Sequence, residues 1–225
     1  MTRVAVIGAH GRLGRFACER LDAHPEFEVA ARLGKDDDLA ARLADTDAPL
    51  GLDLTVAGLG ARHATLMLEN GLRPVVGTSG VTPEEADALD RLARERDLGG
   101  LVVPNFSLGV CLQQKLAREV AEHFPNVEII ESHHAGKKDA PSGTALDTER
   151  RLREVTGKEA PVHSVRLPGL YSNQEVVFGN DGEVLRLIHE TYSLEAFGPG
   201  IELALRHAAT AEGVAVGLEH ALPPR

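Results

Sequence analysis

Short apolar runs and amphipathic stretches alternate through the first half of the chain. The apolar runs predict strands near residues 4–7, 28–33, 52–57, 74–77 and 101–103. Helical patterns fall between them, near residues 12–23, 38–44, 61–70 and 83–96. The last helix has a clear start signal in Thr82-Pro83-Glu84-Glu85, with a capping Thr, a Pro at the first helical position and acids in the first turn. Because short buried strands that alternate with helices are typical of α/β proteins, we expect a Rossmann-like, doubly wound parallel sheet over residues 1–106.

The pattern changes after Asn105. Asn180-Asp181-Gly182 favours a tight hairpin, because these residues tolerate the positive φ of such a turn. We therefore expect a second, α+β domain with an open mixed sheet over residues 107–199, and a C-terminal segment of about 200–225 that returns to the first domain. The predicted elements are helices near 113–124, 144–156 and 200–211, and strands near 127–130, 162–167, 174–178 and 183–192.

Composition narrows the functional class. The formal net charge of −10 over 225 residues leaves no basic stripe to neutralise phosphates, which argues against nucleic-acid binding. The N-terminus enters a strand at Val4 without the apolar core of a signal peptide, and no apolar run approaches membrane-spanning length. Cys18 and Cys111 form no disulfide framework, so we interpret them as buried thiols of a cytoplasmic protein.

The first predicted strand runs into the glycine-rich stretch Gly8-Ala9-His10-Gly11-Arg12-Leu13-Gly14. Glycines at such a junction let the backbone turn sharply and approach a pyrophosphate, which then rests on the helix N-terminus. The spacing is Gly-x-x-Gly-x-x-Gly and not the standard Gly-x-Gly-x-x-Gly, so an ordinary strand-helix turn is the alternative. The position at the first strand-helix junction favours a dinucleotide site.

The end of the second strand discriminates between the two nicotinamide cofactors. An acid there accepts from the ribose hydroxyl of NAD, whereas a basic group suits the 2′-phosphate of NADP. This strand ends with Arg32 and Lys35, and the acidic run Asp36-Asp37-Asp38 follows, which we interpret as a solvated, helix-capping loop. The pattern leans towards NADPH and leaves NADH open.

Two further loops follow predicted parallel strands. They are Gly77-Thr78-Ser79-Gly80 and Pro104-Asn105-Phe106-Ser107. Doubly wound sheets bind ligands at the carboxyl ends of their strands, so these loops are candidates for the nicotinamide side of the site. Plain turns would also explain their Gly, Pro and Ser residues.

The densest cluster of chemical groups lies between Glu131 and Thr144. His133 and His134 end a predicted strand and can exchange protons near neutral pH. Lys137 follows, and Ser142-Gly143-Thr144 opens a helix whose backbone N–H groups suit a carboxylate or phosphate. The cluster predicts a site for a small acidic substrate. We expect no metal, because the segment lacks a third close His or Cys ligand and lysines flank Asp139.

These motifs together resemble the dihydrodipicolinate reductase family of the diaminopimelate route to lysine. The resemblance covers nearly the whole chain. Its most specific part is Glu131-Ser132-His133-His134 with Lys137-x-Asp139-Ala140-Pro141-Ser142-Gly143-Thr144. The first loop, Gly77–Gly80, the stretch 104–110 and the stretches 162–170 and 174–179 also match. The resemblance implies hydride transfer from NADPH or NADH to a cyclic imine dicarboxylate, by a homotetramer assembled through the sheets of the second domain.

Carried over position by position, the family pattern assigns roles to the candidate residues. His133 is expected to be the acid/base residue and Lys137 a proton donor. His134, Ser142, Gly143 and Thr144 are expected to hold the substrate carboxylates. Cofactor binding falls to Gly8, Ala9, His10, Gly11, Arg12 and Leu13 at the pyrophosphate, Lys35 at the adenosine ribose, and Gly77, Thr78, Ser79, Val103, Pro104, Asn105 and Phe106 near the nicotinamide.

The chain departs from the family pattern at several places. The loop after the fourth strand carries Ser79 where the family has a second Thr, and Val56 stands where a proline is common. Ser172-Asn173-Gln174-Glu175 replaces a frequent Ala-His-Gln-Glu, and the segment between Thr156 and Val162 is short. None of these positions is a proposed acid/base residue.

Two other functions are compatible with the same predicted two-domain fold. One is another two-domain oxidoreductase; an aldehyde dehydrogenase would need a nucleophilic cysteine, and neither Cys18 nor Cys111 has a neighbouring His in sequence. The other is a non-catalytic protein that senses NAD(P), which a degenerate acid/base loop would favour. The loop is intact, so we expect catalysis. We also expect the two domains to close around their ligands.

Overall fold

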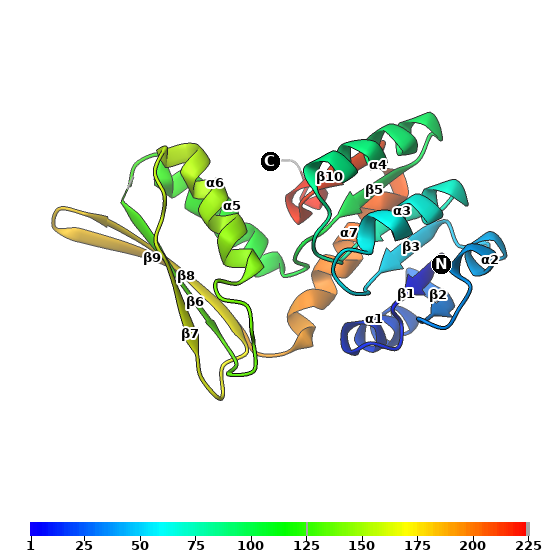
Figure 1. Cartoon of the computed structure of the whole chain (residues 1–225), viewed down its shortest axis with the longest axis horizontal. Coiled ribbons are helices and arrows are strands. Elements are labelled where there is room, and N and C mark those ends of the chain that lie inside the picture. The colour runs from blue at the N-terminus through cyan, green and yellow to red at the C-terminus, as the bar shows by residue number, and fades with distance from the viewer. Residues whose placement is uncertain (125, 224–225) are drawn as a thin grey trace. The chain divides into compact units, whose positions relative to one another are not determined.

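The computed structural model describes residues 1–124 and 126–223. The chain forms two compact units, of which the first joins Met1–Phe106 with the C-terminal segment from Phe197, and the second is Ser107–Ala196 (Figure 1). The fold class predicted from the sequence, a Rossmann-like parallel sheet with a second α+β unit, is confirmed.

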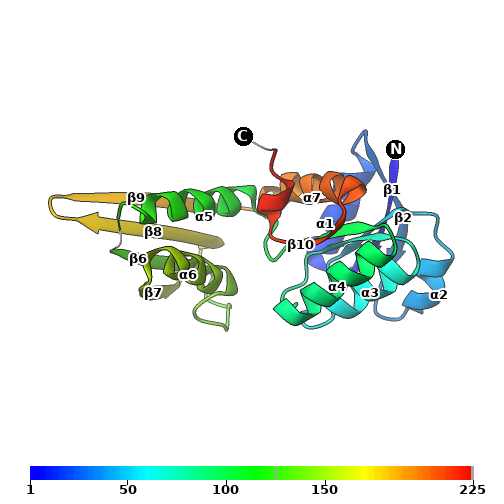
Figure 2. The ribbon, with the colours of Figure 1, turned by 90° about the horizontal axis from the view of Figure 1, so that it is seen from above.

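The first unit is built on a six-stranded parallel sheet in the order β10-β5-β4-β3-β1-β2. Helices α3 and α4 cover one face of this sheet, and α1 and α7 cover the other (Figure 2). The strands are β1 (Thr2–Ile7), β2 (Phe27–Leu33), β3 (Leu50–Asp53), β4 (Arg73–Val76), β5 (Gly99–Val102) and β10 (Gly213–Val216). The helices are α1 (Arg12–Asp22), α2 (Leu39–Ala44), α3 (Gly60–Glu69), α4 (Pro83–Glu95) and α7 (Gly198–Thr210), with a short 3₁₀ turn at Leu218–Ala221. Another 3₁₀ turn, Leu194–Phe197, lies where the second unit ends and the first resumes.

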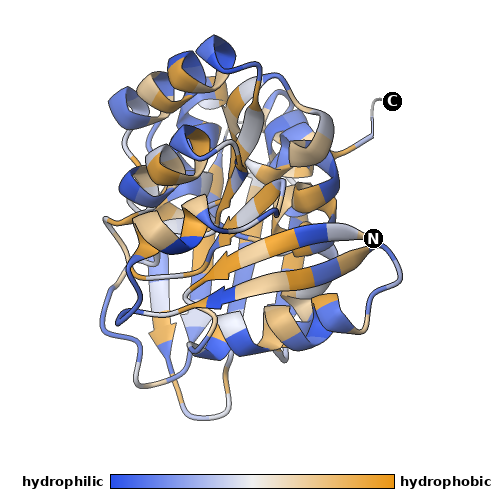
Figure 3. Ribbon diagram, turned by 90° about the vertical axis from the view of Figure 1, so that its right-hand side faces the viewer, coloured by the Kyte–Doolittle hydropathy of each residue, from blue (hydrophilic) through white to orange (hydrophobic). Residues whose placement is uncertain are grey.

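Burial on both faces explains why these strands are short apolar runs. Val4 to Ile7 have almost no exposed surface, and strands buried on two sides lose the polar alternation of a half-exposed sheet. Figure 3 shows hydrophobic strands at the centre, between helices that are hydrophilic on their outer sides. The parallel arrangement brings the carboxyl ends of all six strands to one edge, where the candidate cofactor loops begin.

The second unit is a four-stranded mixed sheet in the order β7-β6-β8-β9, with α5 and α6 on one face (Figure 1). Strands β6 and β7 are parallel, and the other two pairs are antiparallel. The hairpin between β8 and β9 turns at Gly182, which has φ +87° as its tight turn requires. The elements are α5 (Leu108–Ala121), β6 (Val127–His133), α6 (Gly143–Thr156), β7 (Val162–Arg166), β8 (Ser172–Asn180) and β9 (Glu183–Thr191).

The two faces of this sheet have different surroundings. Ile129, Val176 and Phe178 point towards the helices and pack with Ala117 and Leu152 in a buried core. Residues on the other face remain exposed, among them Val184 and Ile188, with 61% and 63% of their surface accessible. One face of the second sheet is therefore uncovered within a single chain.

Several boundaries differ from those predicted. β3 ends at Asp53, several residues earlier than expected, because Asp53 already joins the hydrogen bonds of the following loop. α5 begins at Leu108, since the Ser107 side chain accepts from the Val110 N–H and caps the helix. Strand β6 continues to His133, and the edge strand β10 was not predicted.

Replacement of Phe178 tests the core of the second unit. We expect Phe178→Ala to lower the free energy of unfolding by about 3–5 kcal/mol, because the buried ring leaves a cavity. Chemical denaturation followed by circular dichroism measures the change. Leu116→Ala, at a half-exposed position of α5, is the control and should change stability by less than about 0.5 kcal/mol. Equal effects of the two variants would contradict the assigned core.

Candidate active site

The first glycine-rich loop has the shape of a phosphate-binding turn. Gly8 has φ +83°, and a Cβ there would lie 2.6 Å from the Leu54 carbonyl oxygen. A Cβ on Gly14 would lie 2.0 Å from the Gly8 carbonyl oxygen, so only glycine lets α1 begin so close to β1. The N-cap of α1 is Gly11, which brings no side chain to the first helical N–H groups. The loop therefore fits the pyrophosphate of a dinucleotide.

The end of β2 presents two cations to solvent, Arg32 and Lys35, which differ in their ion pairing. Lys35 is exposed, and among the residues that the structure describes it forms no ion pair. Arg32 is paired with Asp22 at the end of α1, so that its charge is already balanced. Asp37 accepts from the Gly34 N–H at 2.7 Å and Asp38 caps α2, as expected for a helix-capping loop. His10 lies against Gly34, because a Cβ on that glycine would be 2.7 Å from His10 Cδ2.

The two candidate nicotinamide loops expose only some of their side chains. Thr78 is buried and its hydroxyl donates to Asp53 Oδ2 at 2.7 Å, whereas Ser79 is exposed. Val103 and Phe106 are buried in the unit, so their side chains serve packing. A Cβ on Gly77 would lie 2.3 Å from the Phe106 ring, which ties the two loops together. The accessible groups here are Ser79, Pro104 and Asn105 and the main chain.

In the second unit a buried carboxylate holds the first histidine of the pair. His133 ends β6, and its Nδ1 lies 2.5 Å from Oε2 of Glu131. Residues two apart on a strand share a face, so the side chains meet without a turn. Glu131 has no exposed surface. It also accepts two hydrogen bonds from Arg166, at 2.9 and 2.7 Å, and one from the Ser142 N–H at 3.2 Å.

These contacts fix the charge state of Glu131 and the position of the proton on His133. Burial alone would raise the pKa of Glu131, but hydrogen bonds from Arg166, Ser164 and His133 outweigh it and hold the pKa below its usual range. Glu131 is therefore ionised and can only accept, so His133 carries its proton on Nδ1. Burial lowers the pKa of His133, and the positive charges of Lys137 and Arg166 lower it further, against the opposite effect of Glu131. The other ring nitrogen, Nε2, lies 3.1 Å from the Ser172 hydroxyl.

The remaining candidates lie in the loop that follows. His134 is exposed, and Lys137 donates to the exposed carboxylate of Asp139 at 2.8 Å. Ser142 is buried, and its hydroxyl accepts from the Ala145 N–H, so it serves as the N-cap of α6. Gly143 and Thr144 form the first turn of α6, and Gly143 has open space where a side chain would stand. The structure thus brings His133, Lys137 and the start of α6 to one end of the second sheet.

Three residues of this arrangement were missed by sequence reasoning as functional groups. They are Glu131, Arg166 and Ser172. The signal for Glu131 was present, since it lies two residues before His133 on a strand. Arg166 and Ser172 are brought to His133 by strand pairing across β7 and β8, which the sequence pattern alone does not reveal. Among the described residues, no group of three or more His, Cys, Asp or Glu side chains is arranged to hold a metal ion.

Comparisons with known proteins cover nearly the whole chain. Residues 2–106 match the family model "Dihydrodipicolinate reductase, N-terminus", and residues 109–222 match "Dihydrodipicolinate reductase, C-terminus". The 4-hydroxy-tetrahydrodipicolinate reductase of Legionella pneumophila (strain Lens) is 41% identical, over 98% of this chain and 99% of the relative. The enzyme of the same name from Lactococcus lactis subsp. cremoris (strain SK11) is 40% identical, over 98% and 97%.

Solved structures agree with these matches. A dipicolinate-bound dihydrodipicolinate reductase from Paenisporosarcina sp. TG-14 has a TM-score of 0.88 and 32% identity, over 99% of this chain and all of that one. A scyllo-inositol dehydrogenase from Lactobacillus casei, with a TM-score of 0.65 at 10% identity, shares the fold alone. On the two family models and the curated relatives, the chain belongs to the dihydrodipicolinate reductase family.

Proposed function

We propose that this protein reduces 4-hydroxy-tetrahydrodipicolinate to tetrahydrodipicolinate with NADPH or NADH, in the diaminopimelate route to lysine. The family membership and the names of its relatives support the reaction. The observation in the structure that carries it is the Glu131–His133 pair, which holds an imidazole beside the N-terminus of α6. An intact acid/base group argues against a purely nucleotide-sensing protein.

The reaction sets two requirements for the second unit. The 4-hydroxyl group leaves as water, and the resulting conjugated imine accepts a hydride and a proton. The substrate carries two carboxylates, so the site must offer positive charge and N–H donors. When bound, the reduced nicotinamide supplies the hydride. The protein's task is then to hold the dicarboxylate and to supply the proton.

The carboxylates are assigned to the loop and helix after β6. The first N–H groups of α6, at Gly143 and Thr144, combine hydrogen-bond donors with the positive end of the helix dipole. His134 and Lys137 add donors and charge from the same loop. Ser142 caps the helix by accepting from the Ala145 N–H, and its hydroxyl can still donate to a carboxylate. The substrate contact expected from the family pattern stays a prediction.

His133 is assigned as the acid, with Nε2 as the atom that carries the transferred proton. Glu131 fixes the other nitrogen in its protonated form, so the ring cannot exchange its two nitrogens. The imidazole is neutral near pH 7 in the free protein because its pKa is lowered. A bound dianion stabilises the imidazolium, so substrate binding should raise the pKa of His133 and favour protonation of Nε2. Lys137 is a second proton donor, and in the free protein its ammonium group is paired with Asp139, which competes with the substrate for it.

The nicotinamide dinucleotide is assigned to the first unit. The residues present fit it, because the close backbone contacts at Gly8 and Gly14, which a Cβ would break, let the loop turn tightly between β1 and α1. Gly8 to Leu13 would hold the pyrophosphate and Lys35 a ribose phosphate. The loops at Gly77–Ser79 and Val103–Phe106 would face the nicotinamide. Lys35 alone supports NADPH, since Arg32 is taken up by Asp22.

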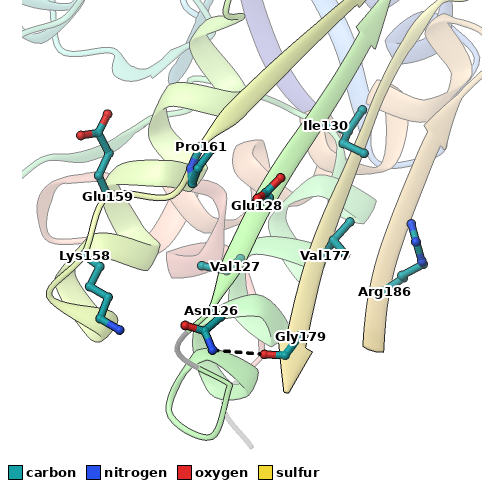
Figure 4. Close-up of a pocket in the computed structure, with 10 residues that line it drawn as sticks. All are labelled: Asn126, Val127, Glu128, Ile130, Lys158, Glu159, Pro161, Val177, Gly179 and Arg186. Carbon is teal, nitrogen blue, oxygen red and sulfur yellow. Dashed lines mark hydrogen bonds between the residues drawn. The ribbon is translucent and has the colours of Figure 1, made fainter. Parts of the chain in front are cut away.

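We further infer a cytoplasmic homotetramer that assembles through the uncovered face of the second sheet. This face is exposed at Val184 and Ile188 and contains a hollow of about 550 Å³. Figure 4 shows side chains from three strands around it, including Ile130, Val177 and Arg186. A sheet face with exposed apolar side chains is stabilised by a covering layer. No described helix is long and apolar enough to cross a membrane.

The reductase activity is tested by NADPH and NADH oxidation, with the substrate made in place by dihydrodipicolinate synthase. His133→Gln should lower kcat about 10²–10⁴-fold, because the proton donor is lost. His123→Gln, at an exposed position on the same unit, is the control and should retain wild-type activity. If the wild-type protein oxidises neither cofactor, or if His133→Gln keeps full activity, the proposal fails.

The charge state of His133 provides a second test. A nuclear magnetic resonance titration should place its pKa below the ordinary value of about 6.5. Glu131 stabilises the imidazolium, so Glu131→Gln should lower this pKa further. The acid form of His133 is lost as pH rises through its pKa, so kcat/KM should fall with rising pH. The midpoint of this fall should lie at a lower pH in Glu131→Gln than in the wild type. A midpoint that rises in the variant would refute the assigned pairing.

The assembly is tested by light scattering coupled to size-exclusion chromatography. Ile188→Lys should dissociate a tetramer, because a charge would be buried in the uncovered sheet face. Leu116→Lys places the same charge on α5, on the other side of the sheet, and should leave the mass unchanged. A wild-type monomer would refute the tetramer, and an Ile188→Lys variant that stays tetrameric would show that another surface is used.

A further inference from the structure

A second buried carboxylate lies in the first unit, outside the residues with an assigned role. Asp53 is the last residue of β3 and has no exposed surface. Burial of a charged group is unfavourable unless hydrogen bonds replace its lost hydration. Asp53 therefore depends on its neighbours, and the identity of those neighbours indicates what it does.

Three side chains satisfy this carboxylate. Thr78 donates to Oδ2 at 2.7 Å, and Thr55 donates to Oδ1 at 2.7 Å from its hydroxyl and at 3.2 Å from its N–H. His63 Nδ1 lies 3.2 Å from Oδ1. Burial alone would raise the pKa of Asp53, but the hydrogen bonds from His63, Thr78 and Thr55 outweigh it and keep the pKa below its usual range. Asp53 is thus an ionised acceptor, and His63 must carry a proton on Nδ1.

These partners belong to three different segments. Thr55 lies in the loop after β3, Thr78 in the loop after β4, and His63 in the first turns of α3. Main-chain contacts join the same segments, since Gly77 N–H donates to the Asp53 carbonyl at 2.8 Å and Gly58 N–H to the Ser79 carbonyl at 3.2 Å. The two loops and the helix start therefore form one connected body at the edge where the strands end.

We propose that Asp53, with His63, is a positioning pair that holds the Gly77–Ser79 loop in the conformation that binds the nicotinamide half of the cofactor. This inference rests on the proposed function. Asp53 acts through Thr78 and does not touch the ligand, because it is fully buried. The Thr78 hydroxyl is directed inward to Asp53, so any contact of Thr78 with the cofactor comes from its main chain or its methyl group.

The pair should act on one half of the cofactor only. The pyrophosphate loop does touch the segment after β3, since a Cβ on Gly8 would meet the Leu54 carbonyl. That segment is held there by the Leu54 N–H, which donates to the Ile7 carbonyl at 2.9 Å without the Asp53 side chain. Loss of the carboxylate should therefore release the nicotinamide side and leave the adenosine side in place. A purely structural role would weaken both halves alike.

The test compares NADPH with 2′-phospho-ADP-ribose, which lacks the nicotinamide, by calorimetric titration of the whole protein. We expect Asp53→Asn to weaken NADPH binding about tenfold, which equals about 1.4 kcal/mol, and to change 2′-phospho-ADP-ribose binding less than twofold. In Asp53→Asn without a ligand, hydrogen exchange of the backbone amides should be faster than in the wild type at residues 77–80 and unchanged at residues 8–14. Equal weakening of both ligands, or no change in either, overturns the proposal.

A milder pair of variants decides the question if Asp53→Asn does not fold. Thr55→Val removes one donor to Asp53 at similar volume, and Thr55→Ser keeps it. NADPH affinity should fall in Thr55→Val and stay near wild type in Thr55→Ser, with 2′-phospho-ADP-ribose unaffected by either. Equal NADPH affinity in the two variants overturns the proposal. A wild-type protein that binds both ligands but reduces no substrate would refute the proposed reaction alone.

Discussion

The carboxylate of Glu131 holds together the chemical end of the second unit. It accepts from Arg166 on β7, from the Ser142 N–H at the start of α6 and from His133 on its own strand. A buried charge that loses one partner is strongly destabilised, typically by about 3–5 kcal/mol. The three partners are therefore held in fixed relation by a single ion. The imidazole and the N-terminus of α6 are placed by the same constraint.

The two carboxylates without exposed surface in the described part of the chain, Glu131 and Asp53, are held in similar ways by different partners. Asp53 ends β3 and Glu131 lies two residues before the end of β6; each has a lowered pKa and each accepts from a histidine. Glu131 is balanced by the bidentate guanidinium of Arg166, whereas Asp53 is satisfied by two threonine hydroxyls and His63. Polar groups of this kind are costly to leave unpaired, so they restrict their loops to one arrangement. Stable packing of the sheets supplies the surrounding low-polarity environment that makes these hydrogen bonds strong.

The sequence predicted local features better than contacts across the sheet. Apolar runs located β1 to β6, and the start signal at Thr82 located α4, because each depends on neighbours in the chain. β10 was missed because Gly213–Val216 is short and follows a polar turn, and it is a strand only by pairing with β5. Arg166 and Ser172 lie beside His133 because of the register in which β7 and β8 pair with β6. Local sequence patterns do not reveal this register. Arg32 was considered for the cofactor, but a tertiary ion pair with Asp22 engages it.

The placement of β10 has a consequence for the order in which the protein is made. β5 pairs with β4 on one side and with β10 on the other, and β10 lies after the whole of the second unit in the chain. During synthesis the outer edge of β5 stays without its partner until residues 107–196 have been translated. An unpaired strand edge is a template for association with other chains. The nascent chain thus presents the inner strand β5 as an unpaired edge until its C-terminal segment emerges, and the four-residue strand β10 then takes over that edge.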